Sequence, residues 1–223
     1  MKKKTAIVYV DGLNLYYGSL RKTRHKWLDP EKLFDHLLPD FEVKKIYFFS
    51  ADLKGKFKPD DPQAPSRQKT YFRALESLGR VQMVKGNFTM QPSESLLRIS
   101  GSGRLSYFLK QRLRGVTAQV WKVEEKGADV SMGSYLTRDA VLKRADLFLL
   151  VTRDSDLAGT VAMLRQEFEA PIAACFPGKT QSGALVRAGL VRQLYLSNGT
   201  LEISQLPNPV VIKGESIYKP ESW

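Results

Sequence analysis

Two apolar segments, far apart in the sequence, each lead into carboxylates. Residues 6–10 are followed directly by Asp11. Residues 147–151 are followed, after Thr-Arg, by Asp154 and Asp156. Short apolar runs of this kind predict buried strands, and charge at the end of a buried strand needs a partner. Because clustered carboxylates cannot all stay ionised without a cation, a divalent metal is the partner that they favour.

Two more polar residues can reach the same edge of a sheet. Asp129 opens a predicted helix, and helix entry tilts it toward that edge. Asn14 follows Asp11 on the first turn of the first helix, where it can hold a water molecule or a phosphate. Oxygen-only ligands favour Mg²⁺ or Mn²⁺ over zinc. A site of this kind can activate water and stabilise the leaving oxygen during phosphodiester cleavage.

Each carboxylate alone also has a structural interpretation. Asp11 precedes a glycine, as in many turns, Asp154 can cap a helix, and Asp129 suits the first turn of a helix. The presence of Asp at the same end of both strands favours the site, because such strand ends meet where the strand order reverses. Asp139 and Asp146 are weaker candidates and stay outside the predicted site.

The bulk composition narrows the class of protein. The chain has 223 residues, of which 43% are hydrophobic, enough for one domain with a full core. Its net charge of +12 favours a polyanionic partner, and nucleic acid is the commonest. The single cysteine fits a reducing cytoplasm. No apolar run reaches about 18 residues, so neither a transmembrane helix nor a membrane partner is expected.

Strands alternate with helices along the chain. Strands are predicted at residues 5–10, 43–51, 81–86, 118–123, 147–151, 171–176 and 194–196. Helices are predicted at residues 13–20, 30–38, 67–78, 129–142, 156–168 and 184–188. This alternation predicts an α/β domain with a mainly parallel central sheet and helices on both faces. The domain is expected to span residues 1–205, with an inserted hairpin or loop at about 87–115 and an irregular tail at 206–223.

Three segments together resemble the NYN domain, a branch of the PIN-like ribonucleases. They are residues 10–14 (VDGLN), 124–130 (EEKGADV) and 151–157 (VTRDSDL), and their order and spacing match that family. The resemblance implies a PIN-like, Rossmann-like three-layer sandwich, dependence on Mg²⁺ or Mn²⁺, and cleavage of RNA. The metal-binding and catalytic acids that it implies are Asp11, Asp129, Asp154 and Asp156, with Asn14 in support. The chain departs from the family at Thr152-Arg153, where Ser-Gly is frequent, and at Leu157, where Phe is usual.

Basic residues are predicted to hold the substrate backbone around this site. Basic and aromatic side chains interleave in residues 54–58 and 67–73, as on surfaces that bind single-stranded nucleic acid. The alternative is that Tyr71 and Phe72 belong to the core face of a helix. The predicted RNA-binding residues are Lys54, Lys58, Arg67, Lys126, Arg153 and Lys179.

The resulting hypothesis is a cytoplasmic, metal-dependent endoribonuclease that hydrolyses RNA through an acidic Mg²⁺ or Mn²⁺ site. RNA, single-stranded or structured, is the expected partner, and a homodimer is a further possibility. One alternative is a PIN-like module that binds RNA or protein without cutting it. Another is a metal-dependent phosphatase of small phosphoesters, which the extended basic character disfavours.

Overall fold

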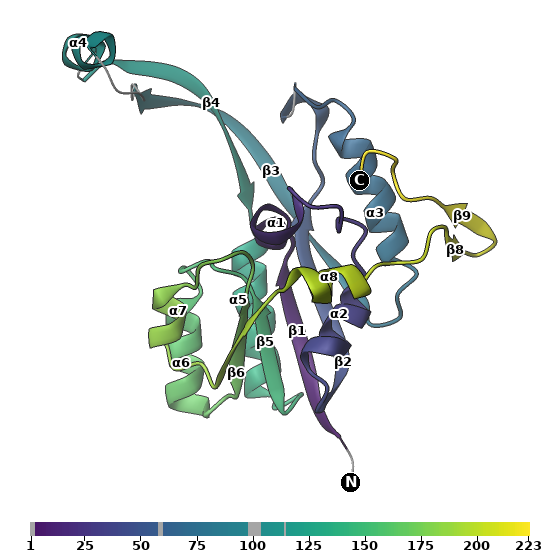
Figure 1. Ribbon diagram of the computed structural model, residues 1–223. Helices are drawn as coiled ribbons and strands as arrows, with labels where there is room; N and C mark the ends of the chain where they lie inside the picture. The colour runs from purple at the N-terminus through teal and green to yellow at the C-terminus, as the bar shows by residue number, and fades with distance from the viewer. Residues whose placement is uncertain (1–2, 58–59, 98–103, 114) are drawn as a thin grey trace.

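The computed structural model describes residues 3–57, 60–97, 104–113 and 115–223, and these form an α/β fold around one large sheet (Figure 1). The sheet has seven described strands in the order β4-β3-β2-β1-β5-β6-β7. They are β1 (Lys4–Asp11), β2 (Phe41–Ala51), β3 (Val81–Leu96), β4 (Thr117–Lys126), β5 (Leu147–Val151), β6 (Ile172–Phe176) and β7 (Arg192–Tyr195). All neighbouring strands are parallel except β3 and β4. The prediction of a mainly parallel α/β sheet is confirmed.

Strand order reverses at β1, which pairs with β2 on one side and with β5 on the other. The register places Val10 beside Phe48 of β2 and beside Val151 of β5. β1 and β5 are buried over almost their whole length, which explains why both read as continuous apolar runs. Their carboxyl ends therefore lie together at the reversal point, where open α/β sheets form their sites.

Helices cover both faces of the sheet and enclose two hydrophobic cores (Figure 1). One face carries α2 (Pro30–Leu37), α3 (Ala64–Leu75) and α8 (Asn198–Ile203). The other carries α5 (Ala128–Val141), α6 (Ala158–Phe168) and α7 (Gly183–Arg187). Residues of β1 alternate between the two cores, as the twofold repeat of a strand requires. Asp29 is the N-cap of α2, because its side chain accepts hydrogen bonds from the backbone N–H groups of Glu31 and Lys32.

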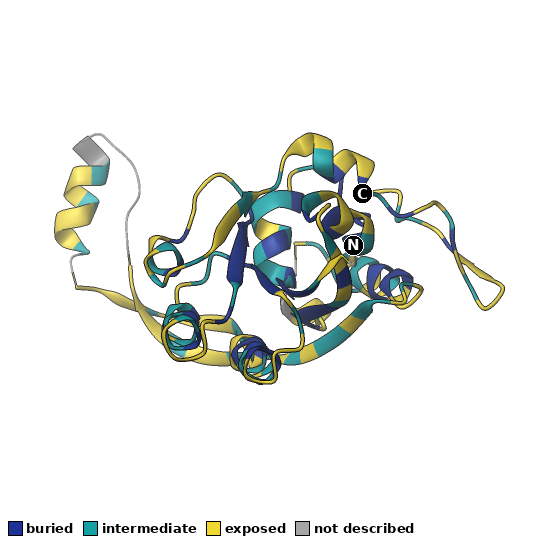
Figure 2. Ribbon diagram, turned by 90° about the horizontal axis from the view of Figure 1, so that it is seen from below, coloured by how far each residue is buried: buried dark blue, intermediate teal, exposed yellow. Residues whose placement is uncertain are grey.

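The predicted insertion forms an arm that extends away from the sheet (Figure 1). β3 and β4 continue as an antiparallel ribbon, in which residues 87–96 pair with residues 117–126. Helix α4 (Arg104–Arg112) lies at its far end, and residues 98–103 and 114 lie outside the described residues. Most of the arm is exposed, including Trp121 at 66% (Figure 2).

The C-terminal segment differs from its prediction as an irregular tail. It contains an antiparallel hairpin of β8 (Val210–Ile212) and β9 (Glu215–Ile217). Val210 and Ile217 are buried in the same core as α2 and α3. Trp223 packs on Tyr71 with ring centroids 5.8 Å apart. The sparse periodicity of this segment concealed these anchors, because two short strands and single aromatic contacts leave little pattern in the sequence.

Two short connections complete the fold near the reversal point. β1 runs into α1 (Gly12–Leu15) and then into a single π-helical turn, η1 (Tyr16–Leu20). Such turns occur frequently at functional sites. A 3-10 turn, η2 (Gly55–Phe57), precedes α3. Within the described part of the chain, no helix combines the length and the apolar character that crossing a membrane needs.

Candidate active site

A cleft of about 270 Å³ opens at the carboxyl ends of β1 and β5. We call it the acidic cleft, because carboxylates from three separate segments line it. Its lining residues are Asp11, Leu13, Asn14, Tyr17, Glu125, Asp129, Arg153 and Asp154. Three of the four predicted acids, the supporting Asn14 and Arg153 are thus brought together from distant parts of the chain. Their roles in binding or catalysis stay predictions.

Asp11 ends β1 and holds the start of the next helix. Its Oδ1 accepts a hydrogen bond from the backbone N–H of Asn14 at 2.8 Å, so it is also the N-cap of α1. The following residue must be small, because a Cβ on Gly12 would lie 2.5 Å from the ring of Phe48 and 2.8 Å from the carbonyl oxygen of Phe49. The turn interpretation of Asp11-Gly12 and its place in the cleft are therefore both correct.

Thr152 connects the acids of the two strands, and the sequence reasoning missed this role. The residue is fully buried. Its hydroxyl donates to Asp11 Oδ2 at 3.1 Å and accepts from the backbone N–H of Asp154 at 3.0 Å. The hydroxyl of Thr152 therefore orients Asp11 and the turn that carries Asp154.

Asp154 and Asp156 have different positions although only one residue separates them. Asp154 lines the cleft, and its Oδ1 accepts from the backbone N–H of Asp156 at 3.0 Å. Asp154 does not cap α6, whose N-cap position is Leu157. Asp156 is exposed and does not line the cleft, although its charge contributes to the raised pKa of Asp129.

The third acidic segment is the turn from β4 into α5. Gly127 has a φ of +91° at the start of α5, a left-handed conformation that glycine adopts readily. This turn places Asp129 in the first turn of α5 and turns Glu125 into the cleft. Glu124, on the opposite side of the strand, pairs with Lys122 and Lys126 instead. Glu125 was not among the predicted site residues, and the alternation of side chains along the strand is the signal that could have found it.

Burial and mutual repulsion raise the pKa values of three cleft carboxyl groups. For Asp11 the main cause is burial, opposed by its hydrogen bonds from Asn14 and Thr152. For Asp129 the pKa rises through burial and then through the charges of Asp154, Asp11 and Asp156. Burial, together with Asp11 and Asp129, raises the pKa of Glu125 to about 7. A carboxyl group with this pKa can take up and release a proton at neutral pH.

The acids of the cleft have no cationic partner in the described structure. None of Asp11, Asp129 or Asp154 forms an ion pair with a described residue. Arg153 turns toward Thr180, to whose hydroxyl it donates at 2.9 Å, while its buried Nε has no hydrogen-bond partner. The Oε1 atom of Glu125 is likewise buried without a hydrogen-bond partner.

The predicted metal centre is not assembled in this arrangement. Among the described residues, no group of three or more His, Cys, Asp or Glu side chains is placed to hold a metal ion. The two histidines, His25 and His36, do not line the cleft, so any ion held there would have oxygen ligands only. Mg²⁺ or Mn²⁺ as a cofactor stays a prediction.

Of the predicted RNA-binding residues that the structure describes, Arg153 lines the cleft and the others do not. Lys126 pairs with Glu124, and Arg67 pairs with Asp61. Lys54 and Lys179 are exposed, and neither lines the cleft. Lys58 lies outside the described residues. RNA as a partner stays a prediction.

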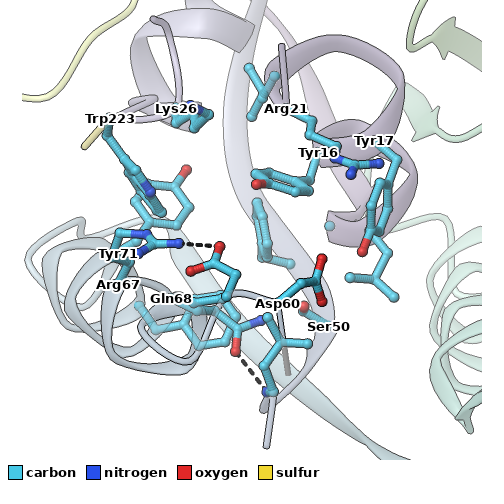
Figure 3. A pocket seen from close by; sticks show the side chains of 18 residues that line it. Tyr16, Tyr17, Arg21, Lys26, Ser50, Asp60, Arg67, Gln68, Tyr71 and Trp223 are labelled. Carbon is cyan, nitrogen blue, oxygen red and sulfur yellow. Dashed lines mark hydrogen bonds and ion pairs between the residues drawn. The ribbon is translucent and has the colours of Figure 1, made fainter. Parts of the chain in front are cut away.

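A second hollow, of about 160 Å³, shares the walls of the acidic cleft at Leu13 and Tyr17 (Figure 3). We call it the aromatic pocket, after the six rings in its lining. They belong to Tyr16, Tyr17, Phe48, Tyr71, Phe72 and Trp223. Tyr71 and Phe72 lie in the core, as the alternative interpretation held, yet both also line this pocket. The sequence reasoning did not predict the pocket, because its lining comes from both ends of the chain.

No family model matches the chain. The chain is 28% identical to the 6-hydroxy-3-succinoylpyridine 3-monooxygenase HspA of Pseudomonas putida, over 97% of this chain and 74% of that protein. It also resembles the crystal structure of a protein of unknown function from Vibrio parahaemolyticus, with a TM-score of 0.53 and 16% identity. That likeness covers 89% of this chain and 98% of the other and concerns the fold alone.

The similarity to HspA overturns the ribonuclease hypothesis. A relative that aligns with almost the whole chain is named a monooxygenase, which is an oxidoreductase and not a hydrolase of RNA. The acids at the strand ends suggested hydrolysis because carboxylates there so often hold metal ions. The same side chains can instead transfer protons, and the residue types alone do not separate the two uses.

Proposed function

We propose that this protein is an oxidoreductase that introduces oxygen into a small aromatic molecule. The observation that carries the proposal is the similarity to HspA over 97% of the chain. The name of that relative specifies a hydroxylated pyridine ring with a succinoyl chain as the molecule that it acts on.

The chemistry of this class defines what the chain must supply. A monooxygenation places one oxygen atom of O₂ on a ring carbon and reduces the other to water, with two electrons and two protons from a donor such as NADH and the solvent. Any cofactor would activate the oxygen, while the protein binds the ring, orients it and moves protons. Glu125, with a pKa of about 7, is suited to take up and release a proton at neutral pH.

We also infer that the fold is of the PIN-like type found in NYN domains. The inference is supported by acids that follow β1 and β5 on the two sides of the reversal point, in the order of the family segments. An experimental structure superposed on NYN domains tests it. Matching strand order and overlapping positions of Asp11, Asp129 and Asp154 are expected, and a different strand order would contradict it.

Oxygen incorporation tests the proposed activity directly. The purified protein is incubated with hydroxypyridine and hydroxybenzene carboxylic acids, NADH or NADPH, and isotopically heavy O₂, with flavins and divalent ions each added and omitted. Oxygen consumption and a product that carries one heavy oxygen atom are expected. A product whose new oxygen comes from water, or no product under any of these conditions, would contradict the proposal.

A further inference from the structure

We propose that the aromatic pocket binds the ring of a small hydroxylated aromatic carboxylate, with the carboxylate at Lys26 and the ring hydroxyl at Ser50. This proposal rests on the proposed function for its substrate class, but it assigns the binding site from the structure alone. The pocket lies between η1 and α3 and includes the last residue of the sequence, Trp223 (Figure 3).

The size and lining of the pocket suit one aromatic ring. A dry cavity of about 150 Å³ is large enough for benzene, and this pocket measures about 160 Å³. Tyr71 stands near the centre of the ring cluster, with its ring centroid 6.5 Å from Phe48 and 5.8 Å from Trp223. Tyr71 and Phe48 are held in tilted and edge-on contacts, so the pocket offers fixed ring faces and edges to a planar ligand.

One end of the pocket carries positive charge that the protein does not neutralise. Figure 3 shows Lys26 beside Trp223 and Arg21 near Tyr16. Neither cation forms an ion pair with a described residue, and Arg21 stacks over the ring of Tyr17 at 5.5 Å. A carboxylate on the ligand could form an ion pair at this end with Lys26, which is half-buried, and with Arg21, which is exposed.

The third cation of the pocket is already matched. Arg67 pairs with Asp61, which leaves its charge balanced within the pocket wall. The cations of the pocket without an ion pair are therefore Lys26 and Arg21. Because they lie at one end, the negative end of a ligand ring should point toward them.

The other end of the pocket carries groups that suit a ring hydroxyl. Ser50 is 2% exposed and lines the pocket. Its hydroxyl can both donate and accept a hydrogen bond, so it can bond to a hydroxyl on a ligand ring. Figure 3 shows Asp60 next to Ser50, where its carboxylate can accept a hydrogen bond from the same ring hydroxyl.

The binding test needs no turnover. Isothermal titration calorimetry measures the affinity of the intact protein for para-hydroxybenzoate, para-hydroxybenzamide and benzoate, which differ only in the charge of one end or in the hydroxyl of the other. We expect the hydroxybenzoate to bind about tenfold more tightly than either analogue, as one good polar contact is worth. Equal affinity for all three compounds, or no binding of any, would overturn the proposal.

Paired variants assign each end of the ligand. Lys26→Met should remove the preference for acid over amide, while Lys22→Met, which changes an exposed lysine outside the pocket, should leave it unchanged. Ser50→Ala should remove the preference for the hydroxyl. Ala64→Phe fills the pocket from the start of α3 and should abolish binding of all three compounds, with the far-ultraviolet circular dichroism spectrum unchanged.

The outcomes separate this proposal from the proposed function. Binding with the expected preferences but without oxygen incorporation supports the pocket and contradicts the oxidoreductase. Oxygen incorporation that survives Ala64→Phe and Lys26→Met supports the oxidoreductase and places its substrate elsewhere, which overturns the pocket assignment.

Discussion

Asp139 of α5 and the carboxylates of the acidic cleft differ in whether they have cationic partners. Asp139, within α5, is fully buried and accepts hydrogen bonds from Tyr9, Arg138 and Arg144 at 2.9, 2.8 and 2.9 Å. The carboxylates of the acidic cleft are less buried, and although Arg153 lines the same cleft, none of them forms an ion pair with a described residue.

The acids of the cleft lack ion pairs even though the chain has many cations. The chain has a net charge of +12, and it places two arginines on one carboxylate in α5. A buried charge that serves the fold is paired, because an unpaired one is costly. Carboxylates that are left repelling one another, with raised pKa values, are characteristic of functional sites.

Removing the paired carboxylate should have the largest effect on stability. Asp139→Ala leaves the buried hydroxyl of Tyr9 and two arginines without their acceptor. We expect the free energy of unfolding to fall by about 3 kcal/mol, measured by urea denaturation. Asp40→Ala, at an exposed position, is the control and should change it by less than about 0.5 kcal/mol. An equally small effect for Asp139→Ala would remove the contrast between the two groups.

Substitution in the acidic cleft should instead affect activity. Asp11→Asn keeps an oxygen that can accept from the backbone N–H of Asn14, so the free energy of unfolding should change by less than about 1 kcal/mol. The rate of oxygen incorporation should fall about 100-fold, which corresponds to about 2.7 kcal/mol in the activation barrier. Full activity in this variant would show that the cleft is not the catalytic site.

Thr152 tests whether the cleft depends on its connecting hydroxyl. Thr152→Val keeps the shape of a buried residue but loses the bond to Asp11 and the acceptor for the Asp154 N–H. We expect a loss of about 1–2 kcal/mol in the free energy of unfolding, measured by thermal or urea denaturation. Thr152→Ser keeps the hydroxyl and should retain both bonds. Similar losses in the two variants would point to packing of the methyl group as the cause.

Substitution of Glu125 should have the smallest effect on the free energy of unfolding, and it should stabilise the protein where the other substitutions destabilise it. Its pKa is raised from 4.5 to about 7 in the folded protein, so folding is favoured while the group is protonated. That contribution is present below about pH 4.5 and is lost as the pH rises through about 7.

Removing the charge of this side chain should therefore stabilise the protein at higher pH. At about pH 8 we expect Glu125→Gln to raise the free energy of unfolding by about 1 kcal/mol, a value reduced for screening because the side chain is partly exposed. The gain should disappear well below pH 4.5, where Glu125 is protonated in both the folded and the unfolded protein. A gain that is independent of pH, measured by urea denaturation across this range, would contradict the raised pKa of Glu125.

The pattern of apolar residues along the sequence predicted most helices and strands of the fold. Residues 147–151 form β5 with the predicted bounds, because a strand buried on both faces is apolar throughout. The shorter and more polar elements were less predictable. Asn87 to Leu96 pair with residues 117–126 as an antiparallel hairpin, one of the two forms expected for the insertion, but the hairpin near the C-terminus was not predicted.

The convergence of acids could be predicted, but their surroundings could not. Asp11 and Asp154 were expected at one edge because parallel strands present their carboxyl ends together. Glu125 and Thr152 were missed, because a single glutamate or threonine next to a motif has no distinguishing pattern. RNA cleavage was predicted for this site, and that prediction was wrong, because the residue types of the cleft suit both hydrolysis and proton transfer.

The sequence by itself determined the order of strands and helices, the buried faces of the sheet and the acids at the ends of β1 and β5. These features depend on the apolar periodicity and the capping chemistry of neighbouring residues. Only the tertiary structure decided that the arginines pair with Asp139 and not with the cleft, and that Lys26, Ser50 and Trp223 line one pocket. Such contacts join side chains from distant segments, and the free energy that selects them comes from packing and charge in three dimensions.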